Sequence, residues 1–219
     1  MTADVVMVED HALLADSVSL ALQVEGLDVV RAPLTSVEAV VEAVQAAAPC
    51  LVMLDLDLGE IGDGIALIPP FVALGCDVLV VTGDRNRARL GQALSAGAIG
   101  YVTKDQPFDV LVGTAQRACA GERVIDDNDR QDLLAELRRV RAELDRRRAP
   151  FEALTPREQD VLDHIADGKS VETIAAEFYV STATVRTQVR GILTKLDVTS
   201  QIAAVAKARR AGWLSKSHR

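Results

Sequence analysis

The chain has 219 residues, enough for one large or two small domains, and 49% of them are hydrophobic, so a packed core can form. Residues 1–125 hold 7 Lys and Arg against 17 Asp and Glu, residues 126–150 hold 7 against 7, and residues 151–219 hold 10 against 8. The acidic first part is a poor nucleic-acid surface, so any DNA contact must come from the mildly basic last third. No apolar run approaches the roughly 20 residues of a membrane helix, and the acidic start lacks the basic region of a signal peptide, so we expect a cytoplasmic protein with no membrane partner.

Short apolar runs alternate with helical patterns through the first 125 residues. The runs lie at 4–8, 27–32, 50–55, 77–83 and 98–103, and helices are expected at 11–24, 35–47, 64–74, 86–96 and after Pro107. Five strands alternating with helices predict an α/β fold, a doubly wound five-stranded parallel sheet with helices on both faces. Three isolated cysteines, Cys50, Cys76 and Cys119, lie in apolar stretches and are expected to be buried thiols in a reducing compartment.

Residues 126–150 read as one charged helix. Leu133, Leu137, Val140 and Leu144 are spaced four, three and four residues apart, which is a heptad seam over about two heptads, and Pro150 is expected to end the helix. Two interpretations stay open. The helix either packs on its own domain as a solvated linker, or forms a short parallel coiled coil between two protomers, and two heptads are too few to decide.

The last segment predicts an all-α domain. Helices are expected at 155–167, 170–178, 181–196 and 199–211. Thr155 as N-cap, Pro156 at the first helical position and Glu158 completing a capping box mark the first of them. The domain limits that follow are 1–122, a linker at 123–150, and 151–219.

Polar side chains follow four of the expected strands at the same edge of the sheet. Glu9 and Asp10 follow the first strand, Asp55 the third, Thr82 ends the fourth, and Lys104 follows the fifth. Three converging carboxylates form an oxygen site suited to Mg²⁺, beside which a carboxylate can attack a phosphoryl group. Lys104 and the Thr82 hydroxyl can then contact the phosphoryl oxygens, and Gly83 leaves room for the group.

With these residues in this order, the first part resembles the flavodoxin-like receiver domain of two-component response regulators over roughly residues 3 to 122. The resemblance implies that Asp55 is the phosphoacceptor for a partner histidine kinase. It also implies that Glu9, Asp10, Asp55 and the backbone carbonyl of Asp57 hold Mg²⁺. Thr82 and Tyr101 would be the switch pair, in which the aromatic ring turns inward as the hydroxyl moves toward the phosphoryl group.

The acceptor loop departs from the family pattern. The segment "LDLGEIGDG" at 56–64 has Gly59 in place of the usual proline, and Gly64 lies nine rather than eight residues after Asp55. An acidic Asp57 stands where many relatives have a neutral residue. We expect a longer and more flexible loop, with an effect on how long the phosphoryl group survives.

The same Asp-x-Asp also resembles the nucleophile motif of haloacid-dehalogenase-type phosphatases, with Thr82, Lys104 and the pair Asp126–Asp127 in the required order. The interpretation is disfavoured because the nucleophile strand should come first in the chain, whereas Glu9 and Asp10 precede it and would have no role. Asp126 and Asp127 also open a helix, where Asp is ordinary N-cap material. A protein that is not an enzyme is therefore preferred.

The helix expected at 181–196 has two distinct faces. Its apolar face comprises Val185, Val189, Ile192, Leu193 and Leu196, while Arg186, Thr187, Arg190 and Thr194 lie opposite. Ser181 caps its N-terminus, and helix N-termini suit phosphates. Arg and Thr on the outer face of a helix after a tight turn fit a recognition helix in a major groove.

The whole of residues 154–214 resembles the LuxR-type helix-turn-helix of the NarL/FixJ response-regulator family, with "LTPRE", "IAAEF", "STATV", "KLDV" and "AGW" as the specific matches. The resemblance implies that Arg186, Thr187 and Arg190 contact bases and phosphates, that Lys195 lies near phosphate, and that the last helix dimerises through residues such as Val205. Gln188 and Glu172 depart from the common His and Asn.

Together these patterns predict a transcription regulator switched by phosphorylation that binds a double-stranded DNA operator as a homodimer. A receiver-like regulator that works without phosphorylation remains the alternative. DNA affinity that does not respond to phosphorylation would favour it.

Overall fold

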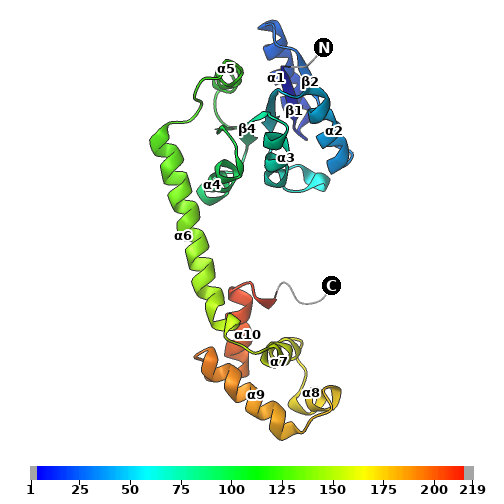
Figure 1. Cartoon of the computed structure of the whole chain (residues 1–219), viewed down its shortest axis with the longest axis vertical. Coiled ribbons are helices and arrows are strands. Elements are labelled where there is room, and N and C mark those ends of the chain that lie inside the picture. The colour runs from blue at the N-terminus through cyan, green and yellow to red at the C-terminus, as the bar shows by residue number, and fades with distance from the viewer. Residues whose placement is uncertain (1–3, 215–219) are drawn as a thin grey trace. The chain divides into compact units, whose positions relative to one another are not determined.

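A computed structural model describes residues 4–214 as two compact units, the first ending at Arg138 and the second starting at Arg139 (Figure 1). The division falls inside the segment 123–150, which the sequence predicts to be a linker. Over residues 4–214, no helix combines the length and apolar character needed to cross a membrane.

The first unit is built on a five-stranded parallel sheet, as expected. Its strands are β1 (Val5–Val8), β2 (Val29–Arg31), β3 (Leu51–Leu54), β4 (Asp77–Thr82) and β5 (Gly100–Thr103), in the order β2-β1-β3-β4-β5. β1 and β3 are buried along their whole length, which explains why their sequences are continuously apolar. The strand order reverses between β1 and β3, and ligands of such sheets bind beyond the carboxyl ends of the strands at this switch point.

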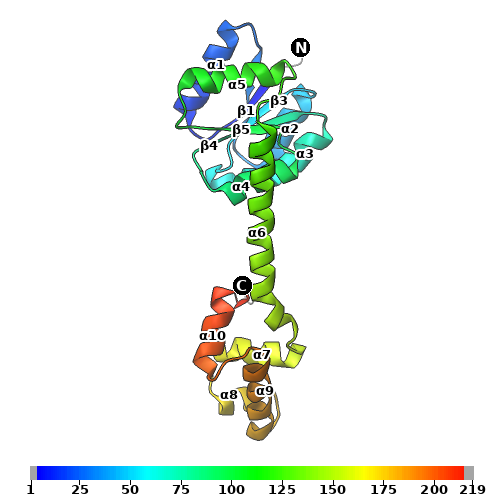
Figure 2. The same cartoon turned by 90° about the vertical axis from the view of Figure 1, so that its left-hand side faces the viewer.

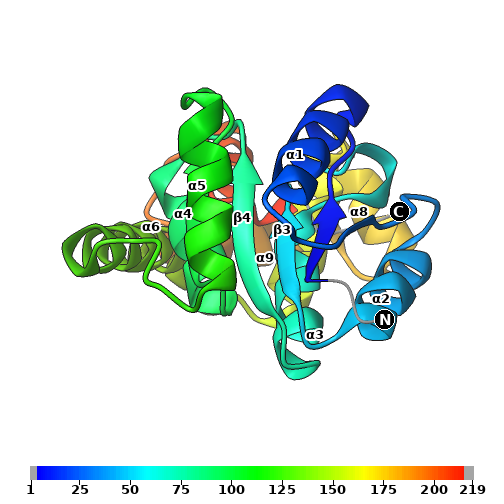
Figure 3. The same ribbon diagram turned by 90° about the horizontal axis from the view of Figure 1, so that it is seen from above.

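Helices cover both faces of this sheet. They are α1 (Ala12–Val24), α2 (Val37–Ala47), α3 (Ile68–Ala73), α4 (Arg87–Ala96) and α5 (Phe108–Cys119). One buried cluster joins α1 and α5 to the sheet, and Figure 3 shows β4 between these two helices in its view. A second cluster joins α2, α3 and α4 to the opposite face. The doubly wound α/β architecture is therefore confirmed.

The region expected as one helix at 64–74 begins instead with a 3₁₀ turn, Gly64–Leu67, before α3. A second 3₁₀ turn, Gly59–Ile61, lies inside the loop that follows Asp55. The prolines at 69 and 70 explain the late start of α3, because proline has no N–H for a helix hydrogen bond and is tolerated in the first turn.

Helix α6 spans Asp127–Glu152, so the expectation that Pro150 ends it is wrong. The helix continues for two residues beyond the proline. Phe151 is fully buried in the core of the second unit and stacks on Trp213 with ring centroids 5.4 Å apart. Burial of a Phe side chain contributes about 1.5–3 kcal/mol, which offsets the helix hydrogen bond that a proline in the last turn gives up.

The second unit contains the four expected helices. They are α7 (Pro156–Ala166), α8 (Val171–Glu177), α9 (Thr182–Lys195) and α10 (Gln201–Arg210). Thr155 and Glu158 form the predicted capping box, and Ser170, Ser181 and Ser200 cap the other three. Of the expected apolar face of α9, Val185, Val189, Ile192 and Leu196 are buried in the core, and Leu193 packs against it partly buried.

The expectation that the three cysteines are buried holds for two of them. Cys50 and Cys76 are buried, and their sulfur atoms lie 3.6 Å apart. Cys119 is exposed, contrary to expectation, because the buried positions of α5 are Leu111, Thr114, Ala115 and Ala118 and the next residue falls outside that face.

Candidate functional site

The carboxylates expected at one sheet edge do converge there. Glu9 and Asp10 follow β1 and Asp55 follows β3, on either side of the switch point. With His11, each of these residues offers a ligand atom within 4.8 Å of the others. Glu9 and Asp55 are buried, with residue exposures of 4% and 2%, so their negative charges sit in a poorly hydrated place. A cation nearby would stabilise such buried charges.

Lys104 supplies one such cation. Its ammonium donates to Asp55 Oδ2 at 2.6 Å and to Glu9 Oε1 at 2.7 Å. Burial lowers the pKa of Lys104, but the hydrogen bonds and charges of Asp55 and Glu9 outweigh it and hold the pKa above its ordinary value. The ammonium therefore stays charged, and the residue after β5 reaches across the edge of the sheet as expected.

One oxygen of this cluster is not satisfied by the described protein atoms. Glu9 Oε2 is buried and has no hydrogen-bond partner among residues 4–214. A buried unpaired carboxylate oxygen is costly, and a bound cation would remove the cost. The donor set of clustered carboxylate oxygens is the kind that Mg²⁺ prefers, so the residues present fit the expected ion.

His11 also lies at this site, although no sequence motif predicts it there. Its Nδ1 lies 2.7 Å from Asp10 Oδ1 and 3.1 Å from Glu9 Oε1, and its backbone N–H donates to Glu9 Oε1 at 2.9 Å. The charge of Lys104 lowers its pKa most strongly, but Asp10 and Glu9 together raise the pKa above 6.5. Its place directly after the acidic pair was the only available signal.

The acceptor loop is a hydrogen-bonded turn. Leu58 N–H donates to the carbonyl of Gly62 at 3.1 Å, and Gly64 N–H donates to the carbonyl of Leu56 at 3.0 Å. Arg89 of α4 donates to the same Leu56 carbonyl at 2.8 Å and to Asp63 at 3.1 Å. These bonds accommodate the extra residue in a fixed turn, so they give no support to the expectation of a more flexible loop.

Two glycines of this loop lie against the acidic residues. A Cβ on Gly64 would meet the backbone oxygen of Asp55 at 2.1 Å, so no other residue fits there without moving the acceptor. A Cβ on Gly59 would lie 3.7 Å from Asp10 Oδ2. The side chain of Asp57 is exposed, and its backbone N–H donates to Asp55 Oδ1 at 3.2 Å.

The expected switch residues lie on β4 and β5. Thr82 is buried, and its hydroxyl oxygen accepts from the N–H of Asp84 at 3.0 Å, which leaves the hydroxyl hydrogen available to donate. Tyr101 is half-buried, and its hydroxyl donates to Asp129 of α6 at 2.8 Å. Burial, followed by the bond to Asp129, raises the pKa of Tyr101 to about 12. The tyrosine thus joins β5 to the following helix.

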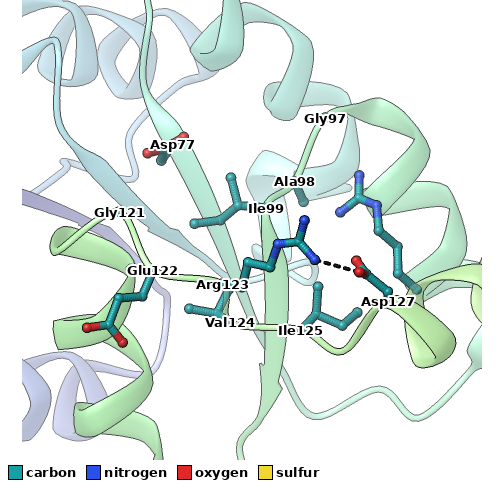
Figure 4. A pocket seen from close by; sticks show the side chains of 12 residues that line it. Asp77, Gly97, Ala98, Ile99, Gly121, Glu122, Arg123, Val124, Ile125 and Asp127 are labelled. Atoms are coloured by element: carbon teal, nitrogen blue, oxygen red, sulfur yellow. Dashed lines mark hydrogen bonds and ion pairs between the residues drawn. The ribbon is translucent and has the colours of Figure 1, made fainter.

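The acidic pair that the phosphatase interpretation needs lies elsewhere. Asp127 and the adjoining segment line a cavity of about 420 Å³, together with Asp77 and Ile99 (Figure 4). Asp77 begins β4, so this cavity lies at the amino end of the strand, whereas Asp55 follows the carboxyl end of its neighbour β3. Asp126 accepts from Asn128 N–H at 2.7 Å, the N-cap role expected for it.

In the second unit, the outer face of α9 is exposed as expected, including Arg186, Thr187 and Arg190. Ser181 Oγ accepts from Thr184 N–H at 3.1 Å as the N-cap. Arg186 lies 3.4 Å from Glu172 of α8, and both side chains are exposed. Glu172 is one of the two residues that depart from the family pattern. Arg190 has no ion pair within the described chain, so its guanidinium is free for a ligand.

Lys195 is not free in the same way. Its ammonium donates to Glu158 Oε2 at 2.6 Å, joining α9 to the capping box of α7. A Cβ on Gly191 would lie 2.6 Å from Glu158 Oε1, so the absence of a side chain lets this carboxylate approach α9. Lys195 therefore has a structural partner, and contact with phosphate would compete with it.

On α10, Ile202 has 84% of its surface exposed, and Val205 is half-buried beside it. Both line a cavity of about 410 Å³ with Ile165, Gln201 and Arg209. Within the described residues this is an apolar surface without a covering element, at the place where relatives are expected to dimerise.

Comparison with known proteins assigns a family to each unit. Residues 5–116 match the response regulator receiver domain, and residues 152–208 match the bacterial regulatory proteins of the luxR family. The chain is 33% identical over 207 residues to the probable transcriptional regulatory protein NarL of Mycobacterium tuberculosis, covering 94% of this chain and 93% of that protein. It is 28% identical to the transcriptional regulatory protein DesR of Bacillus subtilis, covering 94% and 96%.

Among solved structures, the chain resembles RcsB from Salmonella enterica serovar Typhimurium bound to the promoter rprA in the presence of the phosphomimetic BeF3-. The two share 23% identity with a TM-score of 0.50, over 99% of this chain and all of that one. At this level of identity, the likeness supports the fold.

Proposed function

The chain belongs to the response regulators that join a receiver domain to a LuxR-type DNA-binding domain, and from this membership we propose that it is a transcription regulator switched by phosphorylation of Asp55. A histidine kinase would donate the phosphoryl group, and the target would be a double-stranded DNA operator bound by a homodimer. A cytoplasmic location follows from these two partners.

The observation that carries the proposal is the environment of the Asp55 carboxylate. Asp55 is buried at the switch point, with Lys104 at 2.6 Å and the carboxylate of Glu9 on the same ammonium. An attacking Asp55 oxygen would form a bond to phosphorus as the N–P bond of the donor phosphohistidine breaks, and the donor imidazole keeps the electron pair and takes up a proton. Lys104 would then stabilise charge on the transferred phosphoryl oxygens.

Glu9, Asp10, Asp55 and the backbone carbonyl of Asp57 would hold Mg²⁺. When bound, this ion neutralises the developing charge of the phosphoryl group. The unpaired Glu9 Oε2 supports its presence. Thr82 would donate its hydroxyl hydrogen to a phosphoryl oxygen, and Tyr101 would turn inward, so that phosphorylation shifts the population of receiver conformations.

For DNA, Ser181, Arg186, Thr187 and Arg190 would face the major groove or its phosphates. Lys195 would contribute to phosphate contact only when it leaves Glu158. Val205 and Ile202 on α10 are the residues that we assign to the dimer contact on DNA.

The acceptor assignment can be tested by intact-mass measurement after treatment with acetyl phosphate and Mg²⁺. We expect a gain of one phosphoryl group in the wild type and none in Asp55→Ala. Asp16→Ala, which removes an exposed carboxylate paired with Arg31, is the matched control and should gain the group normally. An undiminished gain in Asp55→Ala would rule out this acceptor.

The DNA assignment needs operator fragments, which can be selected from genomic DNA by binding. We expect Arg186→Ala and Arg190→Ala each to weaken binding by about 1–3 kcal/mol at physiological salt, the usual cost of losing a base contact. Arg123→Ala removes an exposed arginine of the first unit and should leave binding unchanged. Normal binding by both α9 variants would rule out this recognition face.

A further inference from the structure

The heptad seam of α6 is covered along only half its length. Leu133 is fully buried and Leu137 is 6% exposed, and Leu133 belongs to the core cluster of the receiver. Val140 is half-buried, and Leu144 has 40% of its surface exposed. The first half of this apolar stripe is therefore packed in the receiver core, whereas Val140 and Leu144 in its second half leave apolar surface exposed.

The covered half lies on α4. A Cβ on Gly91 would meet the backbone oxygen of Leu133 at 2.4 Å and the Cβ of Leu137 at 3.2 Å, so the absence of a side chain at Gly91 lets α6 pack this closely on α4. Figure 2 shows the first turns of α6 beside α4. Asp129, one turn before Leu133, accepts from the Tyr101 hydroxyl at 2.8 Å and lies 3.4 Å from Arg87.

The charges beside the seam fit a second copy of α6. With Leu133 and Val140 at d and Leu137 and Leu144 at a, the g positions are Glu136 and Glu143, and the matching e positions are Arg141 and Arg148. In a parallel pair, each g residue faces the e residue five positions later in the other helix. Both such contacts, Glu136 with Arg141 and Glu143 with Arg148, join opposite charges.

An antiparallel pair would be disfavoured by the same residues. It places g opposite g and e opposite e, which brings Glu against Glu and Arg against Arg. The charge pattern therefore favours a parallel arrangement, in which the two α6 helices run in the same direction.

We propose that α6 has two mutually exclusive partners: the α4 surface of its own receiver, and, once it leaves α4, the α6 of a second copy in a parallel coiled coil. The control of this choice by Asp55 rests on the proposed function. The Tyr101–Asp129 hydrogen bond is the coupling element, because an inward turn of the Tyr101 ring withdraws the hydroxyl from Asp129 and leaves α6 with one polar contact fewer.

The segment before α6 is built so that the helix can leave without opening the receiver core. Val124 packs closely on the start of β5, where a Cβ on Gly100 would meet it at 2.5 Å, and Ile125 packs on the α2–α4 face. Both anchors precede the helix. Two heptads give a weak coiled coil by themselves, so the seam adds to the dimer formed on DNA and does not replace it.

The seam can be tested with a thiol at Leu144, outside the α4 contact. In a Cys119→Ser background, which removes the exposed native thiol, Leu144→Cys is treated with a short bis-maleimide and the covalent dimer is quantified. Gly91→Ala should raise the cross-linked fraction several-fold, because its Cβ forces α6 away from α4. Gly113→Ala, the same change on α5 with nothing within 4 Å of the added Cβ, should leave it unchanged.

The parallel arrangement has its own test. In the Gly91→Ala protein, Arg141→Glu should reduce the cross-linked fraction, since it places Glu opposite Glu136, and Glu136→Arg together with Arg141→Glu should restore it. Asp145→Cys, one residue outside the seam, should cross-link poorly. Equal cross-linking with and without Gly91→Ala, or a double exchange that fails to restore it, would overturn the proposal.

The link to Asp55 is tested separately with beryllofluoride and Mg²⁺ on the protein that has Gly91. Beryllofluoride should raise cross-linking of Leu144→Cys as Gly91→Ala does, and Tyr101→Phe should raise it without beryllofluoride. If acetyl phosphate adds no mass to the wild type, the proposed function fails, whereas the Gly91→Ala result still decides the seam. If mass is gained and cross-linking does not change, the coupling through Tyr101 is wrong.

Discussion

Replacing Lys104 tests the electrostatics of the acidic edge most directly. Lys104→Met keeps most of the length and apolar stem of the side chain but removes the ammonium that bonds Asp55 at 2.6 Å and Glu9 at 2.7 Å. The side chains of the three residues are 17%, 3% and 1% exposed, so water cannot replace the lost cation. Removing one partner of a buried ion pair typically costs about 3–5 kcal/mol, and we expect the free energy of unfolding of the first unit to fall by that amount in EDTA.

The assay is urea unfolding followed by far-UV circular dichroism, with the fluorescence of Trp213, the single tryptophan, reporting the second unit separately. Arg31→Met is the matched control, because its partner Asp16 is 66% exposed and such surface pairs contribute below about 1 kcal/mol.

Mg²⁺ should have the opposite effect on the free energy of unfolding of this variant. In the wild type, Lys104 already compensates the charge of Asp55 and Glu9, whereas in Lys104→Met these carboxylates have lost that cation, so Mg²⁺ should stabilise the variant more than the wild type. At one hundred times its Kd, a ligand of the native state adds about 2.7 kcal/mol, so Mg²⁺ should return most of the stability that the variant loses. A variant as stable as the Arg31→Met control in EDTA, or one that Mg²⁺ stabilises no more than the wild type, would refute this account of the site.

Three further predictions concern other parts of the chain. Gly64→Ala should slow phosphoryl uptake from acetyl phosphate, measured by intact mass, because its Cβ would lie 2.1 Å from the backbone oxygen of Asp55; uptake at the wild-type rate would contradict the contact. Burial raises the pKa of Glu158, but its hydrogen bonds to Lys195 and to the N-cap Thr155 outweigh burial and hold the pKa below 4.5. The stability that the ionised carboxylate contributes is therefore present above pH 4.5 and is lost as pH falls through the lowered pKa. Glu158→Gln should remove this acid-induced loss of stability, measured by tryptophan fluorescence. Glu172→Asn removes a carboxylate 3.4 Å from Arg186 and should raise affinity for selected DNA in fluorescence anisotropy, and unchanged affinity would mean that the pair does not restrain the arginine.

The sheet and the acidic edge were predictable because both follow from local rules. Strands buried on two faces must be continuously apolar, and the carboxyl ends of parallel strands meet at one edge. Glu9 and Lys104 are 95 positions apart in sequence, yet both were placed at this edge by the strand that each follows. Their roles toward phosphate and Mg²⁺ remain predictions of the proposed function.

Contacts that depend on which surface a residue meets were not predictable in this way. The heptad spacing of Leu133 and Leu137 is the same whether α6 packs on α4 or on another α6, because both surroundings bury the same stripe. The pair of Lys195 and Glu158 joins residues 37 positions apart, and a lysine near the end of a helix has no pattern that distinguishes a structural partner from a phosphate. Pro150 was misread because the burial of Phe151 is a tertiary effect.

Two helical glycines show where sequence and structure inform each other. Gly91 in α4 and Gly191 in α9 each destabilise a helix interior by about 1 kcal/mol relative to alanine, a cost that can be read from the sequence. The reason to retain it can be read only from the structure: an added Cβ would strike the backbone oxygen of Leu133 in one case and the carboxylate of Glu158 in the other. Alanine at either place would improve the helix and worsen the contact, so a gain in helix content together with a loss of the specific contact is the signature of a glycine retained for close packing. Gly113, with nothing within 4 Å of its Cβ, should show the gain alone.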